Sequence, residues 1–242
     1  MTVLLRAEGL AKSFRGLKAV AGASFEVAED QISALIGPNG AGKTTVFNLI
    51  AGVYAPDAGT IHFRGQPIHG LRPDQVCAAG IGRTFQLVKP FPGLSVLDNV
   101  IVGALLVEKT VASARAASLA ILGKLGLDAR ADQPAAMLTL SDRKRLEVAR
   151  ALATRPRLLH LDEVMAGLRP TECDQLVEVF RALHRSEGIA ILMTEHVMRA
   201  VMALAQHIAV LDRGAIIARG APDEVVKNPA VLQCYLGEDT EI

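Results

Sequence analysis

The chain has 242 residues, and its 26 lysines and arginines face 25 aspartates and glutamates, which leaves a formal charge of +1. Half of the residues are apolar, so the composition indicates a globular protein with a buried core and excludes disordered, collagen-like and coiled-coil chains. The balanced charge argues against a protein that coats nucleic acid or an anionic membrane, and we expect no nucleic-acid partner.

The cysteines and the apolar runs bear on where the protein works. Cys77, Cys173 and Cys234 are far apart and odd in number, so we expect reduced thiols rather than a zinc site or a disulfide framework. No apolar run reaches the ~18–20 residues of a membrane-spanning helix. Residues 1–6 lack a secretory signal. We therefore expect a cytoplasmic protein that acts at a membrane only by holding another protein.

Short apolar runs between turn residues predict four strands and one helix near the N-terminus. The strands are expected at 3–6, 23–27, 32–36 and 60–63, and the helix at 45–52. From about residue 88 the pattern predicts helices at 95–106, 112–125 and 142–153. Patterns of buried strands return at 157–161 and 189–193, before a hairpin of 208–211 and 216–218 and a helix pair within 222–236. This order predicts an α/β core interrupted by a mostly helical segment.

Residues 37–44, Gly-Pro-Asn-Gly-Ala-Gly-Lys-Thr, match the phosphate-binding pattern G-x-x-x-x-G-K-[ST] in full, between an apolar strand and a helix. The glycines allow positive φ and a close backbone approach, so successive N–H groups form an anion-binding nest at a helix N-terminus. Lys43 would place its charge on the β- and γ-phosphates, and Thr44 its hydroxyl on Mg²⁺. The predicted nucleotide site consists of Asn39, Gly40, Ala41, Gly42, Lys43, Thr44 and Thr45.

The apolar strand at 157–161 ends in two acids, Asp162 and Glu163. Asp162 is expected to reach Mg²⁺ through water, and Glu163 to polarise the attacking water. The alternative is that the two acids are only solvated carboxylates at a strand end. The complete phosphate-binding loop in the same chain argues against this alternative. His160, inside the strand, is interpreted as a hydrogen-bonded core histidine rather than a catalytic residue.

Three further residues are spaced around these motifs in a familiar pattern. With them, the chain resembles the ATP-binding subunits of ABC transporters over nearly its whole length. Gln86, in Arg-Thr-Phe-Gln, lies where that family has its Q-loop, and His196 follows the strand at 189–193 as the family's switch histidine does. Phe14 lies where an aromatic ring stacks on adenine. The resemblance implies a P-loop NTPase core of residues 1–87 and 154–242 with a mostly parallel sheet and an antiparallel β edge. Residues 88–153 would form an inserted helical subdomain.

The resemblance also implies a mechanism, in which two such subunits close face to face over two ATP molecules. The γ-phosphate and Mg²⁺ would be surrounded by Lys43, Gln86, Asp162, Glu163 and His196. Gln86 would join Thr44 and Asp162 at the metal, and His196 would steady the charge on the transferred phosphoryl group. The implied reaction is ATP hydrolysis coupled to transport.

Three segments resemble, more narrowly, the ATPases of branched-chain amino-acid importers. They are Gly-Ile-Gly-Arg-Thr-Phe-Gln at 80–86, Asp-Glu-Val-Met-Ala-Gly-Leu at 162–168, and the ending at 220–238. This resemblance implies two membrane-spanning permease subunits, a second ABC ATPase subunit (itself or a homologue) and, indirectly, an extracytoplasmic solute-binding protein. The chain would lie on the inner face of the cell membrane, and the solute would be an amino acid or an amide.

The sequence departs from the family at its signature, often Leu-Ser-Gly-Gly-Gln, which in the family meets the γ-phosphate bound to the opposite subunit. The corresponding residues here are Leu138, Thr139, Leu140, Ser141 and Asp142. Thr139 keeps a hydroxyl and forms a capping-box pattern with Asp142, so the helix start is expected to survive. Leu140 and Ser141 add bulk where backbone should approach phosphate. We hypothesise that the composite site using this signature turns over slowly.

Basic residues mark two other departures. Arg-Lys-Arg at 143–145 places positive charge in the first helical turn, against the helix dipole. A solvated basic face and anion attraction at the dimer interface are both open interpretations. Arg169 occupies a position in the dimer-contact loop where the family commonly has Asp or Asn.

Three other functions compete with transport. A non-transport ABC ATPase acting on ribosomes or DNA usually has two cassettes or a coiled-coil or zinc insertion, and this chain has neither. A P-loop kinase or GTPase would need a lid or an N/T-K-x-D motif, which we do not find. A weakly active subunit of a heterodimeric transporter is the third alternative, and the intact Lys43 and Glu163 argue against it.

Overall fold

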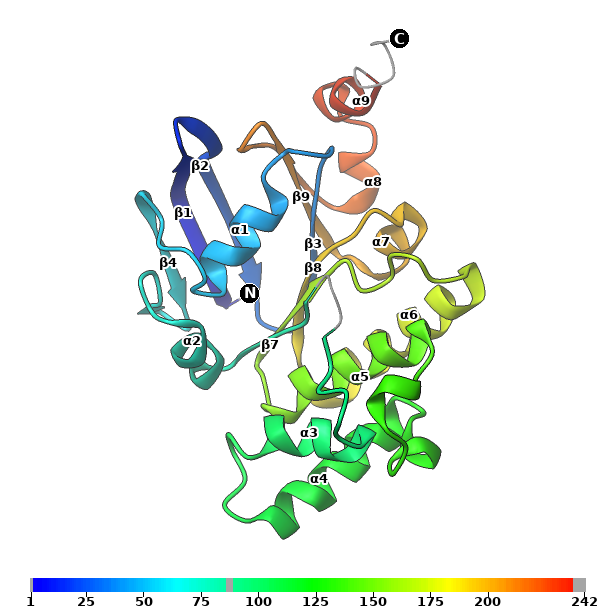
Figure 1. The fold of residues 1–242 in the computed structure, drawn as a ribbon. Helices are drawn as coiled ribbons and strands as arrows, with labels where there is room; N and C mark the ends of the chain where they lie inside the picture. Colours follow the sequence, from blue (N-terminus) through cyan, green and yellow to red (C-terminus); the bar gives the residue numbers. More distant parts are fainter. Residues whose placement is uncertain (1, 86–88, 237–242) are drawn as a thin grey trace.

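A computed structural model describes residues 2–85 and 89–236 of the chain (Figure 1). Its larger sheet has six strands in the order β10-β9-β3-β8-β7-β6, and every neighbouring pair is parallel except β9 with β10. The expected mostly parallel sheet is confirmed. Its strands are β3 (Ile32–Ile36), β6 (Ile81–Arg83), β7 (Leu158–Asp162), β8 (Ala190–Thr194), β9 (His207–Asp212) and β10 (Ala215–Gly220).

A second, antiparallel sheet has the order β2-β1-β4-β5 and forms the expected β edge. Its strands are β1 (Val3–Phe14), β2 (Leu17–Ala28), β4 (Ala58–Phe63) and β5 (Gln66–Pro67). The first two strands are far longer than the sequence pattern predicts. The reason is that their pairing continues through several bulges, and each bulge interrupts the strict alternation of apolar and polar residues.

Helix α1 (Lys43–Ile50) lies between the two sheets (Figure 1). Its buried residues Val46 and Phe47 share a core with residues of both sheets. Because side chains alternate along a strand, β7 turns Leu158 and His160 toward α1, whereas Leu159 packs into the core on the opposite face. Since β3, β8 and β7 are parallel neighbours, the end of β7 lies at the same edge of the sheet as the phosphate-binding loop that follows β3.

Helices α3 (Val96–Ala104), α4 (Val111–Lys124) and α5 (Leu140–Ala153) pack against one another at the lower end of the molecule in Figure 1. Each begins after a hydroxyl residue, Ser95, Thr110 or Thr139, whose side chain accepts a backbone N–H of the first turn. The sequence predicted all three helices to within a residue or two. The proposed division of the chain at 87/88 and 153/154 stays a prediction.

The sequence analysis did not predict three helices, of which α6 is the longest. They are α2 (Pro73–Ala79), α6 (Pro170–Glu187) and α7 (Met198–Leu204). The described part of the chain ends in the expected helix pair, α8 (Pro222–Val225) and α9 (Pro229–Leu236). Within the described ranges, none of the helices combines the length and the apolar character that crossing a membrane requires.

Candidate active site

The phosphate-binding loop connects the fully buried strand β3 to α1, and its glycines are dictated by backbone proximity. Gly42 caps α1 with a φ of 104°, and a Cβ there would lie 2.3 Å from the carbonyl oxygen of Ala19. A Cβ on Gly37 would lie 2.0 Å from the carbonyl oxygen of Leu211. The loop is therefore wedged between β2 and the end of β9, and neither position accepts a side chain.

Lys43 is the first residue of α1, and its side chain turns back into the loop. Its ammonium donates to the carbonyl oxygens of Gly37 at 2.7 Å and Pro38 at 2.8 Å, and only 6% of the residue is exposed. Of the other predicted loop residues, three are exposed, Thr45 is partly exposed and Ala41 is buried. The three exposed residues are Asn39, Gly40 and Thr44. The loop thus surrounds the buried ammonium of Lys43, whereas Asn39, Gly40 and Thr44 are exposed.

Asp162 is the last residue of β7, and both of its carboxylate oxygens are engaged. Thr194 Oγ1 donates to Oδ1 at 3.0 Å from the paired strand β8, and Arg83 Nη2 donates to Oδ2 at 3.3 Å from β6. Only 2% of Asp162 is exposed, so Arg83 supplies the counter-charge that a buried carboxylate needs. The sequence analysis gave no role to Arg83 or Thr194, although both lie at strand ends beside predicted site residues.

Glu163 and His196, both of which the family resemblance assigns to the surroundings of the γ-phosphate, are in direct contact, although 33 residues separate them in the chain. His196 Nε2 lies 3.0 Å from Glu163 Oε1. Glu163 adopts a left-handed conformation with a φ of 48°, and its N–H donates to the carbonyl oxygen of Thr194 at 3.0 Å. Such a conformation is unusual for a residue with a side chain. The turn after β7 therefore aims the carboxylate sideways, toward the end of β8.

Glu195 is a buried acid that the sequence analysis missed. Only 3% of it is exposed, its Oε1 accepts the N–H of Met165 at 2.8 Å, and its Oε2 has no hydrogen-bond partner among the described residues. Burial, together with the nearby negative charge of Glu163, raises the pKa of Glu195 to about 7. The available signal was its position between Thr194 and His196, directly after a buried strand.

His160 lies in the core, as interpreted, but the expectation that it is hydrogen-bonded is wrong. Neither of its ring nitrogens has a hydrogen-bond partner in the described part of the chain, and none of the residue is exposed. Its ring packs on Phe47 of α1, with 3.6 Å between the ring centroids. Burial holds the pKa of His160 well below its usual value, so the imidazole stays neutral in the core.

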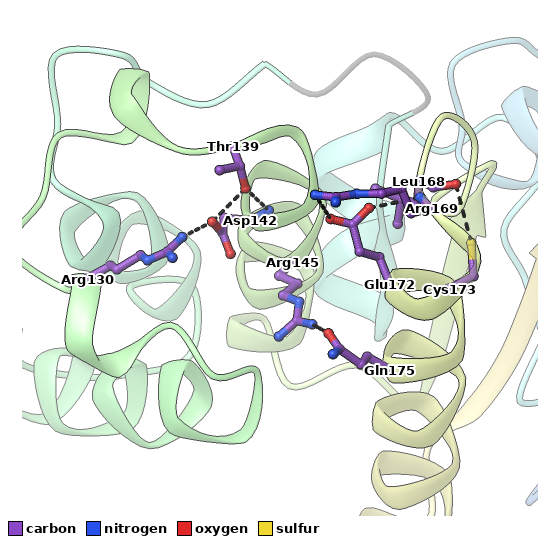
Figure 2. Close-up of polar contacts among 9 residues, drawn as sticks. All are labelled: Arg130, Thr139, Asp142, Arg145, Leu168, Arg169, Glu172, Cys173 and Gln175. Atoms are coloured by element: carbon purple, nitrogen blue, oxygen red, sulfur yellow. Dashed lines mark hydrogen bonds and ion pairs between the residues drawn. The ribbon is translucent and has the colours of Figure 1, made fainter.

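Of the signature residues, Leu140, Ser141 and Asp142 form the first turn of α5, and Leu138 and Thr139 directly precede the helix (Figure 2). The helix begins at Leu140 rather than at the predicted Asp142 because Thr139 caps it. Thr139 Oγ1 accepts the N–H of Asp142 at 3.2 Å and donates to Asp142 Oδ2 at 2.6 Å. Arg130 forms an ion pair with the same carboxylate (Figure 2). Leu138 and Ser141 are buried, whereas half of Leu140 is exposed.

The three consecutive basic residues at 143–145 in α5 do not form a solvated face. Lys144 is 4% exposed and donates to the carbonyl oxygen of Glu163 at 3.0 Å. Arg143 donates to the carbonyl oxygen of Ala136, and Arg145 to that of Leu125. The interpretation as a solvated basic face is therefore wrong, and the cations instead tie α5 to its surroundings.

Arg145 and Arg169 make contacts that Figure 2 draws. Arg145 Nη2 donates to Gln175 Oε1 of α6 at 2.5 Å. Arg169 precedes α6, and its N–H donates to Glu172 Oε2 at 2.8 Å. Its own guanidinium is mostly exposed and lies 3.6 Å from Glu172 Oε1. Arg169 thus closes a capping contact at the start of α6.

One predicted residue, Phe14, lies outside this cluster. Phe14 ends β1 and packs edge-on against Tyr54, with 5.2 Å between the ring centroids and 38% of the residue exposed. An exposed ring suits stacking on a base, and its role toward adenine stays a prediction. Gln86, the predicted Q-loop residue, lies outside the described residues.

A family model described as ABC transporter matches residues 20–166, which include the phosphate-binding loop, Asp162 and Glu163. The chain belongs to the ABC transporter ATP-binding proteins. The resemblance seen in the sequence is therefore confirmed, and the chain is an ATPase of this class. A second model, described as Branched-chain amino acid ATP-binding cassette transporter, matches residues 215–241.

Named relatives among the ABC transporter ATP-binding proteins match the chain from end to end. The high-affinity branched-chain amino acid transport ATP-binding protein LivG of Salmonella typhimurium is 41% identical over 97% of this chain and 98% of its own length. BraF of Pseudomonas aeruginosa, with the same description, is 38% identical over the same shares. The lipopolysaccharide export system ATP-binding protein LptB of Acidithiobacillus ferridurans is 34% identical over 100% of both chains.

Solved ABC cassettes share the fold. A nucleotide-free ATP-binding cassette from an ABC transporter superposes with a TM-score of 0.88 at 29% identity, covering 97% of this chain and 99% of that chain. An ATP-binding cassette in its ADP conformation gives a TM-score of 0.88 at 30% identity, covering 98% and 100%. The expected fold of an ABC ATPase is thereby confirmed.

Proposed function

We propose that this ATPase powers the uptake of branched-chain amino acids through separate permease subunits. The observation that carries the chemical part is the contact between Glu163 and His196 at the ends of two paired strands. A carboxylate held in this way, at the sheet edge where the phosphate-binding loop follows β3, can polarise a water molecule beside a bound γ-phosphate. The relatives' names and the match at 215–241 support the choice of cargo.

The roles follow from placement and charge. Lys43 would exchange its two carbonyl partners for phosphate oxygens, because an anion attracts the ammonium more strongly than a neutral carbonyl does. His196 would hold Glu163 in position and then stabilise the charge on the transferred phosphoryl group. Phe14 would stack on adenine. The Leu138–Asp142 segment would face the nucleotide of a second ATPase subunit, with the N-terminus of α5 toward the phosphates.

The proposed cofactors are ATP and Mg²⁺. Thr44 and, through water, Asp162 would hold the ion, together with Gln86. Their oxygens fit the preference of Mg²⁺ for hard ligands, and the ion takes most of its remaining ligands from water and phosphates. Within residues 2–85 and 89–236 no cluster of three or more His, Cys, Asp or Glu side chains could hold a metal, and a nucleotide-borne ion requires none. When bound, the ion would neutralise charge on the phosphates.

The proposed partners are two membrane-spanning permeases, a second ABC ATPase subunit and, indirectly, an extracytoplasmic solute-binding protein. The chain would then lie on the inner face of the cell membrane. Similarity to LptB makes lipopolysaccharide export the second candidate. Its lower identity and the branched-chain match at 215–241 favour amino-acid uptake.

The test purifies the tagged full chain from detergent-solubilised membranes and reconstitutes the recovered complex in vesicles. We expect permease subunits and ATP-dependent uptake of labelled leucine. Glu163→Gln should assemble and bind ATP but lose about 10²- to 10⁴-fold in turnover, the usual contribution of a general base. Glu178→Gln, on the exposed side of α6, is the matched control and should behave as wild type.

Two results would contradict the proposal. Recovery of the chain without any membrane protein, or of a complex that moves lipopolysaccharide but not leucine, would discard the uptake function. Normal turnover in the Glu163→Gln complex would refute the assignment of Glu163 as the base.

A further inference from the structure

Lys144 is a cation that lies on the buried face of α5. The buried residues Ser141, Lys144, Val148 and Ala151 follow one another at helical spacing along that face. The long side chain of Lys144 leaves the helix and reaches the turn after β7, where Nζ donates to the carbonyl oxygen of Glu163 at 3.0 Å. A residue of the signature helix thus contacts the backbone of the residue proposed as the base.

This contact adds to the hydrogen bonds that hold the backbone of Glu163 in place. The N–H of Glu163 donates to β8 through the carbonyl oxygen of Thr194, and the carbonyl oxygen of Glu163 accepts from Lys144 and, at 3.3 Å, from the N–H of Ala166. The left-handed conformation of Glu163 costs free energy and persists only where its surroundings hold it. Lys144 is the part of these surroundings that comes from α5.

The charges around Lys144 explain why a lysine can be buried here. The nearby carboxylates are Glu195, Glu163, Asp162 and Glu147. Burial lowers the pKa of Lys144, and these four carboxylates act in the opposite direction. The ammonium therefore belongs to the acidic cluster of the site rather than to solvent.

We propose that Lys144 is a positioning residue for ATP hydrolysis, which couples the location of α5 to the geometry of the Glu163 turn. The proposal rests on the proposed function of Glu163 as the base. Because α5 begins at Leu140, within the segment predicted to meet the opposite nucleotide, a displacement of that helix pulls on the Glu163 carbonyl. The Glu163 carboxylate is then aligned with the attacking water only when α5 lies where it is placed by two subunits closed over ATP.

A second contact of α5, made with α6, provides the matched control. Arg145, one residue further along α5, donates to Gln175 on α6 (Figure 2). That contact anchors α5 without touching Glu163. Gln175→Ala removes the α5–α6 contact and leaves the Lys144 contact in place.

The experiment measures ATP affinity and steady-state ATPase kinetics of the complex purified through the full-length chain. Lys144→Met keeps the size of the side chain and removes the donor. We expect kcat to fall about tenfold or more, with KM and ATP affinity changed by less than about twofold. Lys144→Arg should recover most of kcat, and Gln175→Ala should stay within about twofold of wild type.

A charge-balanced variant separates positioning from loss of fold. Lys144→Met leaves acidic groups without their cation, so Lys144→Met/Glu195→Gln restores the balance and Glu195→Gln alone is its reference. The proposal expects the double variant to fold and still show the low kcat. Full kcat in Lys144→Met or in the double variant would overturn it, as would an equal loss in Gln175→Ala. A wild-type complex that fails to hydrolyse ATP, or normal turnover in Glu163→Gln, would instead overturn the proposed function on which the proposal depends.

Discussion

Replacing His160 with leucine tests the account of the core beneath the nucleotide loop. The imidazole is fully buried against Phe47, and neither nitrogen is hydrogen-bonded among the described residues. Leucine has a similar volume and no polar atoms. Since leucine can replace the packing of the ring, and the two buried nitrogens without partners contribute only a desolvation cost, we expect His160→Leu to be about as stable as wild type, or more stable, at pH 8.

The magnitude follows from proton linkage. The pKa of His160 lies well below 6.5 in the folded protein, whereas in the unfolded chain it is near 6.5. Below pH 6.5 the unfolded chain therefore binds a proton that the folded protein does not, and folding stability falls as the pH falls. The loss approaches at most ~1.4 kcal/mol per pH unit and amounts to at most about 2 kcal/mol at pH 5, the limit for an imidazole that stays neutral in the folded protein.

The assay is urea unfolding of both proteins at pH 8, 6.5, 5.5 and 5. Other titrating groups contribute equally to both proteins and cancel in the difference. We expect His160→Leu to gain stability relative to wild type as the pH falls from 8 to 5, by up to about 2 kcal/mol. A difference that does not change with pH, or that favours wild type at pH 5, would refute the reasoning.

Glu195 and Gly103 give two further predictions. The raised pKa of Glu195, about 7 against an ordinary 4.5, means that the folded protein keeps a proton that the unfolded chain loses in this range. The stabilisation that comes from this retained proton is complete below pH 4.5 and is lost as the pH rises through 7. The free energy of unfolding of Glu195→Gln should therefore gain up to about 3 kcal/mol relative to wild type across that window. A difference between the two proteins that does not change with pH would contradict this. A Cβ on Gly103 would lie 2.6 Å from the carbonyl oxygen of Arg150 on α5, so Gly103→Ala should destabilise by about 1–3 kcal/mol in urea unfolding. Gly123→Ala on α4, where a Cβ meets nothing within 4 Å, should stabilise by up to about 1 kcal/mol, and equal effects at both sites would exclude the steric explanation.

The nucleotide loop and the end of β7 were predictable because their chemistry is written in short, local patterns. Eight consecutive residues specify the loop, and a run of apolar residues that stops at Asp162 specifies the strand and its acid. The shared surroundings of Glu163 and His196 were implied only by the family resemblance, and the fold explains them, since the carboxyl ends of neighbouring parallel strands lie together.

What the sequence did not reveal depends on contacts between distant elements. The burial of Lys144 was not predicted because a lysine between two arginines resembles a surface residue, although its helical spacing from Ser141 and Val148 was visible. Helix α6 was missed despite the regular spacing of Leu176, Phe180 and Leu183, because charged residues fill its exposed face. The hydrogen bonds that His160 lacks could be seen only in the folded core.

The register between β7 and β8 limits how the gene for such a protein can change in length. Asp162 pairs directly with Thr194, and the residues that follow each of them, Glu163 and Glu195–His196, emerge side by side. Because side chains alternate along a strand, inserting or deleting one residue within either strand would turn every following side chain to the opposite face. Length variation is therefore confined to the segments that enter these strands and to the surface turns, whereas the stretch from Leu158 to Glu163 and its counterpart up to His196 must keep a fixed count of residues.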